Sequence, residues 1–337
     1  MAFLDIGIDL GTCSIYALDI TRGKEFCEPS IVAVDTRSGK VIGAGKDVSD
    51  MPGKAPGYID VVRPLRDGVI SDFGMTEVLI KHLLGKVTGN QLLKPRVCIC
   101  VPSAITGVEG QAVIDAAMSA GARKVYLIEE PVAAAIGAGI DLSLPNGNMI
   151  VDIGGGTTDI AVLSLNGIVC KKSIRVAGHA FDEAVTKFVR AKHNLLIGER
   201  TAERVKIEIG GVCDGLDAAT TDVKGRDVVS GLPKKVQMSR EQMRHALREP
   251  TDQILLAVVS VLERTPPELA ADIRTNGVIL TGGGALMAGL DKAIERRTNI
   301  STRAAPDPLR CAARGTAKSF DYLGKLYDGF VTTGRQQ

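Results

Sequence analysis

The stretch DIGGGTTDIAV, from Asp152 to Val162, has the pattern of two strands joined by an unusual turn. An apolar strand reaches an aspartate, passes through three glycines and two threonines, and becomes strand again. A hairpin turn needs only one or two special residues. Glycines allow backbone N–H groups to approach a ligand closely, and a concave row of N–H groups attracts anions. This segment therefore predicts a hairpin whose tip binds an anion.

A second segment, near the start of the chain, repeats the pattern. GIDLGT, from Gly7 to Thr12, again places an aspartate, one further residue, a glycine and a threonine at the end of an apolar strand. Asp9 and Asp152 would repel a bare phosphate, so they imply a cation between them, most simply Mg²⁺. This ion is usually held by one or two carboxylates together with substrate phosphates. The repeat predicts two related α/β halves that hold a Mg–nucleotide from both sides of a cleft.

A third glycine turn, Gly282–Gly284 in VILTGGGALMAGL, lies between a predicted strand and a predicted helix. It could admit a nucleoside against bare backbone. Tight packing is the commoner explanation for each of the three turns taken singly, but the set of three, two of them matched, favours nucleotide binding. The turns are neither a P-loop nor a Rossmann fingerprint, because GxxxxGK[ST] and a strand followed by GxGxxG are absent from the sequence.

The composition is that of a soluble globular protein, and the length suggests two domains. Of the 337 residues, 45% are hydrophobic and 24% are charged, and the net charge of +2 gives no reason to expect a nucleic-acid partner. Seven cysteines without CxxC spacing and four dispersed histidines argue against a zinc site or a disulfide framework, and they fit a reducing cytoplasm. The longest charge-free apolar run, residues 254–262, is far shorter than the ~20 residues of a membrane span.

Hydrophobic periodicity and turn residues predict alternating strands and helices. Strands are expected at residues 5–10, 14–20, 30–36, 40–45, 96–102, 124–128, 149–153, 159–165, 168–176 and 277–281, with two short ones between 220 and 238. Helices are expected at 73–87, 109–121, 129–139 and 198–210, at two stretches after 238 that separate near Pro250, and directly after Gly284. Residues 50–67, rich in Pro and Gly, are expected to form a loop.

Long segments, spread from residue 5 to about residue 318, resemble the MreB family of bacterial actin homologues. They are DIGIDLGT, RPLRDGVISDF, KPRVCICVPS, YLIEEPVAAAIGAG, VDIGGGTTDIAV, LLIGERTAERVKIEIG, GRDVVSGLPK, LERTPPELAADI, VILTGGGALMAGLD and DPLRCAARGTAK. Several of them are specific to this family rather than shared across the actin-like ATPase superfamily.

The resemblance implies an α/β, two-domain actin-like ATPase fold, with duplicated ribonuclease-H-like domains around a nucleotide cleft. Domain I would comprise residues 1–140 and 310–337, with a small subdomain at about 31–67. Domain II would comprise residues 141–309, with a small subdomain at about 179–245.

The resemblance also implies roles for single residues. Asp9 and Asp152 would hold the water shell of Mg²⁺, and Glu130 would position the attacking water with help from Thr157. Phosphate contacts would come from Gly11, Thr12, Cys13 and Ser14 in the first hairpin and from Gly154, Gly155, Gly156, Thr157 and Thr158 in the second. Glu203 and Lys206, three apart on one helix face, would contact the adenosine opposite Gly282, Gly283 and Gly284.

Two of these assignments have ordinary alternatives. Glu130 could simply be an acid that suits a helix N-terminus, and Glu203 with Lys206 could be a surface ion pair. One position also departs from the family, which usually has Thr-Ala-Asn where this chain has Thr12-Cys13-Ser14. Ser14 reaches less far than Asn, which bears on the rate of hydrolysis more than on nucleotide binding.

Membership would imply slow ATP hydrolysis coupled to assembly into filaments, with the chain itself as partner in paired protofilaments. The filaments would lie on the inner face of the cell membrane and organise the cell-wall elongation proteins that maintain rod shape. Leu92 and Leu93, beside Lys94 and Arg96, would form a membrane-binding loop. One leucine could instead begin the core contact of the next strand.

Other classes remain open at this point. A filament paralogue with another cargo, such as organelle positioning, would share every feature above. A sugar-kinase-like phosphotransferase would need a further carboxylate base, for which the cleft offers no spare candidate. A chaperone-type ATPase would need a peptide-binding domain after residue 330, where few residues remain.

Overall fold

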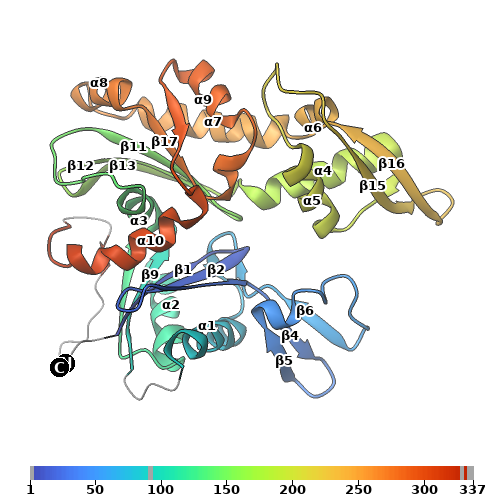
Figure 1. Ribbon diagram of the computed structural model, residues 1–337, viewed down its shortest axis with the longest axis horizontal. Coiled ribbons are helices and arrows are strands. Elements are labelled where there is room, and N and C mark those ends of the chain that lie inside the picture. The colour runs from blue at the N-terminus through green and yellow to red at the C-terminus, as the bar shows by residue number, and fades with distance from the viewer. Residues whose placement is uncertain (1–3, 90–93, 327–329, 332–337) are drawn as a thin grey trace.

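The computed structural model describes residues 4–89, 94–326 and 330–331, and it contains two large mixed β-sheets (Figure 1). The first has six strands in the order β19-β10-β9-β1-β2-β3. They are β1 (Asp5–Leu10), β2 (Ser14–Asp19), β3 (Lys24–Pro29), β9 (Arg96–Val101), β10 (Lys124–Glu129) and β19 (Phe330–Val331). The hairpin strands β1, β2 and β3 are antiparallel, whereas β9 runs parallel to both β1 and β10.

The second large sheet repeats this plan with five strands in the order β13-β12-β11-β17-β18. They are β11 (Asn148–Ile153), β12 (Thr158–Ser164), β13 (Gly167–Ile174), β17 (Val278–Thr281) and β18 (Thr302–Ala304). Three consecutive strands are again antiparallel, and the first of them again has a parallel neighbour, here β17. The two matched Asp-Gly-Thr segments are therefore the β1–β2 and β11–β12 hairpins, one in each sheet, as the repeat predicts.

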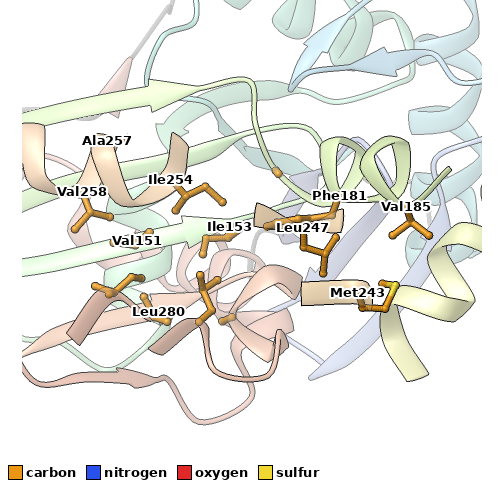
Figure 2. Packing of buried hydrophobic residues seen from close by; sticks show 14 of the residues in the cluster. Val151, Ile153, Phe181, Val185, Met243, Leu247, Ile254, Ala257, Val258 and Leu280 are labelled. Atoms are coloured by element: carbon orange, nitrogen blue, oxygen red, sulfur yellow. The ribbon is translucent and has the colours of Figure 1, made fainter. Parts of the chain in front are cut away.

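Two helices fill the layer between the large sheets: α3 (Glu130–Gly137) and α10 (Cys311–Lys318) (Figure 1). The outer face of the six-stranded sheet packs on α1 (Phe73–Thr88) and α2 (Gly107–Ser119). The outer core of the five-stranded sheet includes residues of α7 (Arg248–Leu262), α8 (Pro267–Asn276) and α9 (Leu290–Thr298). Figure 2 shows part of this core, where Val151 and Ile153 of β11 lie among Ile254, Ala257 and Val258.

Two smaller sheets extend to one side of the large ones (Figure 1). One has the order β5-β4-β6 and consists of β4 (Val32–Asp35), β5 (Lys40–Ala44) and β6 (Ile59–Val62). The other has the order β14-β15-β16 and consists of β14 (Leu195–Leu196), β15 (Thr220–Asp227) and β16 (Pro233–Ser239), next to α4 (Gly178–His193), α5 (Glu199–Ile209) and α6 (Arg240–Ala246). The predicted boundaries of the two domains and of their small subdomains stay predictions.

Short elements complete the described chain. They are β7 (Leu65–Arg66), β8 (Val69–Ile70) and the 3₁₀ turns η1 (Gly45–Val48), η2 (Gly283–Leu286), η3 (Pro308–Arg310) and η4 (Ser319–Tyr322).

Two sequence-based expectations about single elements were wrong. Residues 50–67 are not all loop, because β6 pairs with β4 and so gains its strand from a partner distant in sequence. The turn at Gly282 leads into η2, and the helix α9 begins only at Leu290. The expected break near Pro250 is confirmed: α6 and α7 separate at Leu247, and Pro250 lies in the first turn of α7, where its missing N–H has no intrahelical partner.

Candidate functional site

A cavity of about 540 Å³ lies where the two matched hairpins meet. Its walls come from the β1–β2 turn, the β11–β12 turn, the start of α3, one face of α5 and the turn after β17. The predicted site residues that line it are Asp9, Gly11, Thr12, Cys13, Ser14, Glu130, Asp152, Gly154, Gly155, Gly156, Thr157, Glu203, Lys206, Gly282, Gly283 and Gly284. The fold thus gathers residues from five separate segments around one hollow.

Among the described residues, one predicted site residue, Thr158, is placed elsewhere. Thr158 is buried and does not line the cavity, because its hydroxyl donates a hydrogen bond of 2.7 Å to the carbonyl oxygen of Val176. The Thr158 side chain therefore stabilises the strand region and does not line the cavity. Leu92 and Leu93 lie outside the described residues.

The glycines at the hairpin tips have a packing role as well as access to the cavity. A Cβ atom on Gly156 would lie 2.6 Å from Thr12 Oγ1 and 2.8 Å from Asp67 Cα, which is closer than real Cβ contacts allow. The second hairpin tip therefore packs directly on the first, and a side chain at this position would push them apart. A glycine turn can serve tight packing or ligand binding, and both explanations apply at this position.

The two matched aspartates line the cavity, where Asp152 is buried and Asp9 is half-buried. Burial raises the pKa of Asp9 to about 6 and that of Asp152 to about 7. Asp9 accepts a hydrogen bond from the Cys100 thiol at 3.3 Å, and Asp152 accepts one from the Thr281 hydroxyl at 2.7 Å. Among the described residues no lysine or arginine forms a salt bridge with either of them. Each would be ionised more readily if a cation lay beside it.

This donor set fits Mg²⁺ held through water and phosphate. Hard carboxylate oxygens are the ligands that Mg²⁺ prefers, and it commonly uses only one or two of them. Within the part of the chain that the structure describes, no group of three or more His, Cys, Asp or Glu side chains could hold a metal by itself. A cation here would therefore depend on a phosphate-bearing ligand for the rest of its shell.

Glu130 is the first residue of α3, and its side chain is directed into a group of acids. Burial, followed by the negative charges of Asp159, Asp152 and Asp9, raises the pKa of Glu130 well above its usual range. The surroundings of this carboxyl group therefore favour its neutral form more than water does. Thr157, the other candidate for contact with water, is also buried at the cavity wall.

Lys206 does not pair with Glu203, as the surface-pair alternative would require. Its Nζ atom lies 2.8 Å from Asp182 Oδ1 on α4 and 3.2 Å from the carbonyl oxygen of Gly178, to which it donates. This half-buried pair joins α5 to α4 and leaves the Glu203 carboxylate at the cavity wall. Asp182 could not be singled out in the sequence, because its partner is 24 residues away on another helix.

Cys13 lies at the cavity wall and contacts the opposite side. Its Sγ atom is 3.1 Å from Nε2 of His179, the second residue of α4. Burial raises the pKa of Cys13 to about 11, so the group is a neutral thiol at physiological pH. This departure from the family pattern thus introduces a contact across the hollow without adding a charge.

An apolar part of the cavity wall was not foreseen. Phe181 and Ile207 line it from α4 and α5, and Leu286, Met287 and Leu309 line it from the segments after β17 and β18. Ile207 and Leu286 are 74% and 60% exposed, which is unusual for large apolar side chains and marks a surface suited to a flat apolar ring. The nearby sequence ALMAGL reads as an ordinary amphipathic stretch, so no local pattern indicated this wall.

Comparison with known proteins identifies the family. The family described as MreB/Mbl protein matches residues 3–327. The chain is 46% identical over 323 residues to the cell shape-determining protein Mbl of Bacillus subtilis (strain 168), covering 96% of this chain and 97% of that protein. It is 45% identical over 325 residues to the cell shape-determining protein MreB of Escherichia coli (strain K12), covering 95% and 94% respectively.

Solved structures agree with the sequence relatives. MreB 5 of Spiroplasma citri bound to AMPPNP has a TM-score of 0.92 and 39% identity, covering 96% of this chain and 98% of that one. The MamK double helical filament has a TM-score of 0.79 at 20% identity, covering 94% and 98%, and supports the fold alone. The predicted actin-like α/β fold is confirmed, and the chain belongs to the MreB/Mbl family of cell shape-determining, actin-like proteins.

Proposed function

We propose that this protein binds ATP with Mg²⁺ in the cavity between the two hairpins, hydrolyses it slowly to ADP and phosphate, and assembles with copies of itself into filaments. The filaments would bind the inner face of the cell membrane and organise cell-wall synthesis. The observation that carries this proposal is the meeting of two matched hairpin tips, each with an aspartate in the wall, at one cavity. The relatives support it, because they include cell shape-determining proteins and a protein whose structure was solved bound to AMPPNP.

Different groups of cavity residues would bind different parts of ATP. Backbone N–H groups at Gly11–Ser14 and Gly154–Thr157 would receive the phosphates, while the apolar wall with Ile207 and Leu286 would receive the base. Asp9 and Asp152 would hold hydrated Mg²⁺, which neutralises phosphate charge when bound. Because the hairpins belong to different sheets, a nucleotide between them would favour the arrangement in which both tips are engaged.

Phosphoryl transfer depends mainly on alignment and charge stabilisation, so the main task of the cavity residues would be to position the reacting groups. Glu130 and Thr157 would orient a water molecule towards the terminal phosphate. Glu130 would hold that water by a hydrogen bond. Hydrolysis would be slow and would act as a timer for filament age.

Sedimentation with and without ATP tests assembly. We expect the fraction of protein in the pellet to rise with ATP and Mg²⁺ and to return towards the nucleotide-free level when EDTA removes the metal. ADP serves as the second control, since it fills the site without the terminal phosphate. A protein that binds ATP but stays monomeric at high concentration would overturn the proposed filament function.

Membrane contact would come from Leu92 and Leu93, which follow α1 in the sequence. Lys94 is exposed, whereas Arg96 forms a salt bridge with Asp5 and stacks on Phe320, so of these two cations Lys94 is the one placed to meet anionic lipid. No helix in the described segments is both long and apolar enough to cross a bilayer, which leaves surface binding as the mode to test.

The double variant Leu92→Ser with Leu93→Ser is expected to lower co-sedimentation with anionic liposomes several-fold, because two apolar anchors are lost from every filament subunit. Its ATPase activity should persist, since the cavity residues are unchanged. Leu144→Ser is the matched control, because Leu144 is 47% exposed elsewhere on the surface. Unchanged liposome binding by the double variant would remove this loop from the proposal.

A further inference from the structure

Asp159 is a fully buried carboxylate that the roles above do not use. It is the second residue of β12, and none of its surface is exposed. Its Oδ1 atom accepts a hydrogen bond of 2.8 Å from the backbone N–H of Ser103, while its Oδ2 atom is buried without a hydrogen bond of ordinary geometry in the described chain. Burying a carboxylate is costly unless its oxygens are used, so this residue calls for a specific explanation.

The register of the hairpin sets the direction of the side chain. Asp159 lies directly opposite Asp152 in the β11–β12 pair, and residues that face each other across an antiparallel pair point to the same side of the sheet. Ile150 and Ala161 lie on that same side, and both belong to the core that includes α3. Asp159 therefore points to the layer in which α3 begins with Glu130.

The polar side chains around Asp159 include both residues proposed to position water. Burial raises the pKa of Asp159, and the nearby polar groups that oppose this rise include the Ser103 N–H, the Ser173 and Thr157 hydroxyls and the Glu130 carboxyl. Ser103 and Glu130 follow β9 and β10, which are parallel neighbours with Val101 opposite Glu129. Ser103 follows β9 of the six-stranded sheet, whereas Thr157 immediately precedes β12 and Ser173 lies in β13 of the five-stranded sheet. One carboxylate thus lies at the junction of both sheets and the first residue of α3.

We propose that Asp159 is a positioning residue for hydrolysis: it holds the Glu130 carboxyl and the Thr157 hydroxyl in the orientation that aligns the attacking water, and it links that orientation to the segment after β9. The inference rests on the proposed ATP hydrolysis. Alignment matters because a displacement of about 1 Å can lower a rate by roughly 100-fold. A purely structural role at the strand end would instead change folding stability and leave turnover per folded molecule intact.

Asp159→Asn is the decisive variant, because it keeps the shape and the oxygen that accepts from Ser103 but replaces the other oxygen by a donor. We expect kcat for phosphate release to fall by about 10- to 100-fold, in line with the loss of a positioning contact. The Kd for a fluorescent ATP analogue and the KM for ATP should stay within about threefold, since Asp159 is outside the cavity lining. A general loss of structure would not lower kcat while leaving KM nearly unchanged.

Asp19→Asn is the matched control. Asp19 is equally buried, accepts hydrogen bonds from the backbone N–H groups of Thr21 and Arg22, and lies at the end of β2 remote from the cavity. Neutralising it should leave kcat unchanged. If Asp159→Asn does not fold, as judged by thermal melting with and without ADP, Asp159→Ser provides a smaller acceptor at the same site and is expected to show the same selective loss of kcat.

The possible outcomes distinguish failure of the positioning role from failure of the proposed function. Equal kcat in Asp159→Asn and the unaltered protein, or an equal loss in kcat and nucleotide affinity, would overturn the positioning role while the proposed function stands. If neither Asp159 variant folds, the residue is architectural and the positioning role is wrong. Absence of phosphate release from the unaltered protein would overturn the proposed hydrolysis and this inference with it.

Discussion

Replacing Glu130 with alanine is expected to lower ATP hydrolysis by at least about 100-fold while ATP binding and filament formation persist. General acid–base and water-positioning groups typically contribute 10²- to 10⁴-fold to a rate. Glu130 reaches the cavity wall from the first residue of α3, whereas the proposed phosphate and base contacts come from the hairpin tips and the apolar wall. Phosphate release and sedimentation, measured on the same samples, would show whether hydrolysis is lost and assembly is retained.

The adjacent acid provides the control for this variant. Glu129 ends β10, and its carboxylate lies 2.7 Å from Lys171 Nζ on β13, with which it forms a salt bridge. Glu129→Ala removes an acid from the same turn without touching the cavity wall, so hydrolysis should remain near normal. Normal phosphate release from Glu130→Ala would exclude Glu130 from the mechanism and leave Thr157 as the only proposed residue to orient water.

Replacing Gly315 with alanine is expected to destabilise the protein by about 3 kcal/mol or more, an effect at the upper end of the range for overpacking. Gly315 lies in α10 where this helix crosses α3, and a Cβ atom there would overlap the carbonyl oxygen of Ala133. Gly137 meets the backbone of Cys311 in the same way on the other side of the crossing. Because the obstacles are backbone atoms, the helices would have to separate, and both large sheets pack on them.

Denaturant unfolding of Gly315→Ala against Gly85→Ala would measure this. Gly85 is an exposed residue within α1, and a Cβ atom there would meet nothing within 4 Å. Alanine at that position should stabilise the protein by about 0.5–1 kcal/mol through higher helix propensity. The two variants make the same chemical change in helices, so opposite signs would isolate the effect of the crossing. A Gly315→Ala protein as stable as the unaltered one would show that α3 and α10 can move apart at little cost.

Local sequence pattern was sufficient to predict the parts of the site that are formed by residues close together in sequence. The Asp-Gly-Thr segments predict their own hairpins, because a strand, an acid and glycines follow one another without a break. The spacing of Glu203 and Lys206 predicts one helix face. Resemblance to a family then supplied Glu130, for which the sequence alone favoured an ordinary acid at a helix N-terminus.

Several features depend on contacts that no local pattern encodes. The strand β6 exists because it pairs with β4, and Lys206 is held by Asp182 on a neighbouring helix rather than by Glu203. Arg96, next to the proposed membrane loop in sequence, is turned to Asp5 instead. In each case the partner is distant along the chain, and the choice among possible partners is made by packing.

The sequence by itself determined the two hairpins, the type of ligand they suit and the family, because these follow from short segments whose residues act through the backbone next to them. Only the tertiary structure decided that both tips share one cavity, that Gly156 serves packing as well as access, and that Asp159 lies among Glu130, Thr157 and the segment after β9. The physical reason is burial: the pKa values, the orphaned oxygen of Asp159 and the close crossing of α3 and α10 arise only when segments far apart in sequence exclude water together.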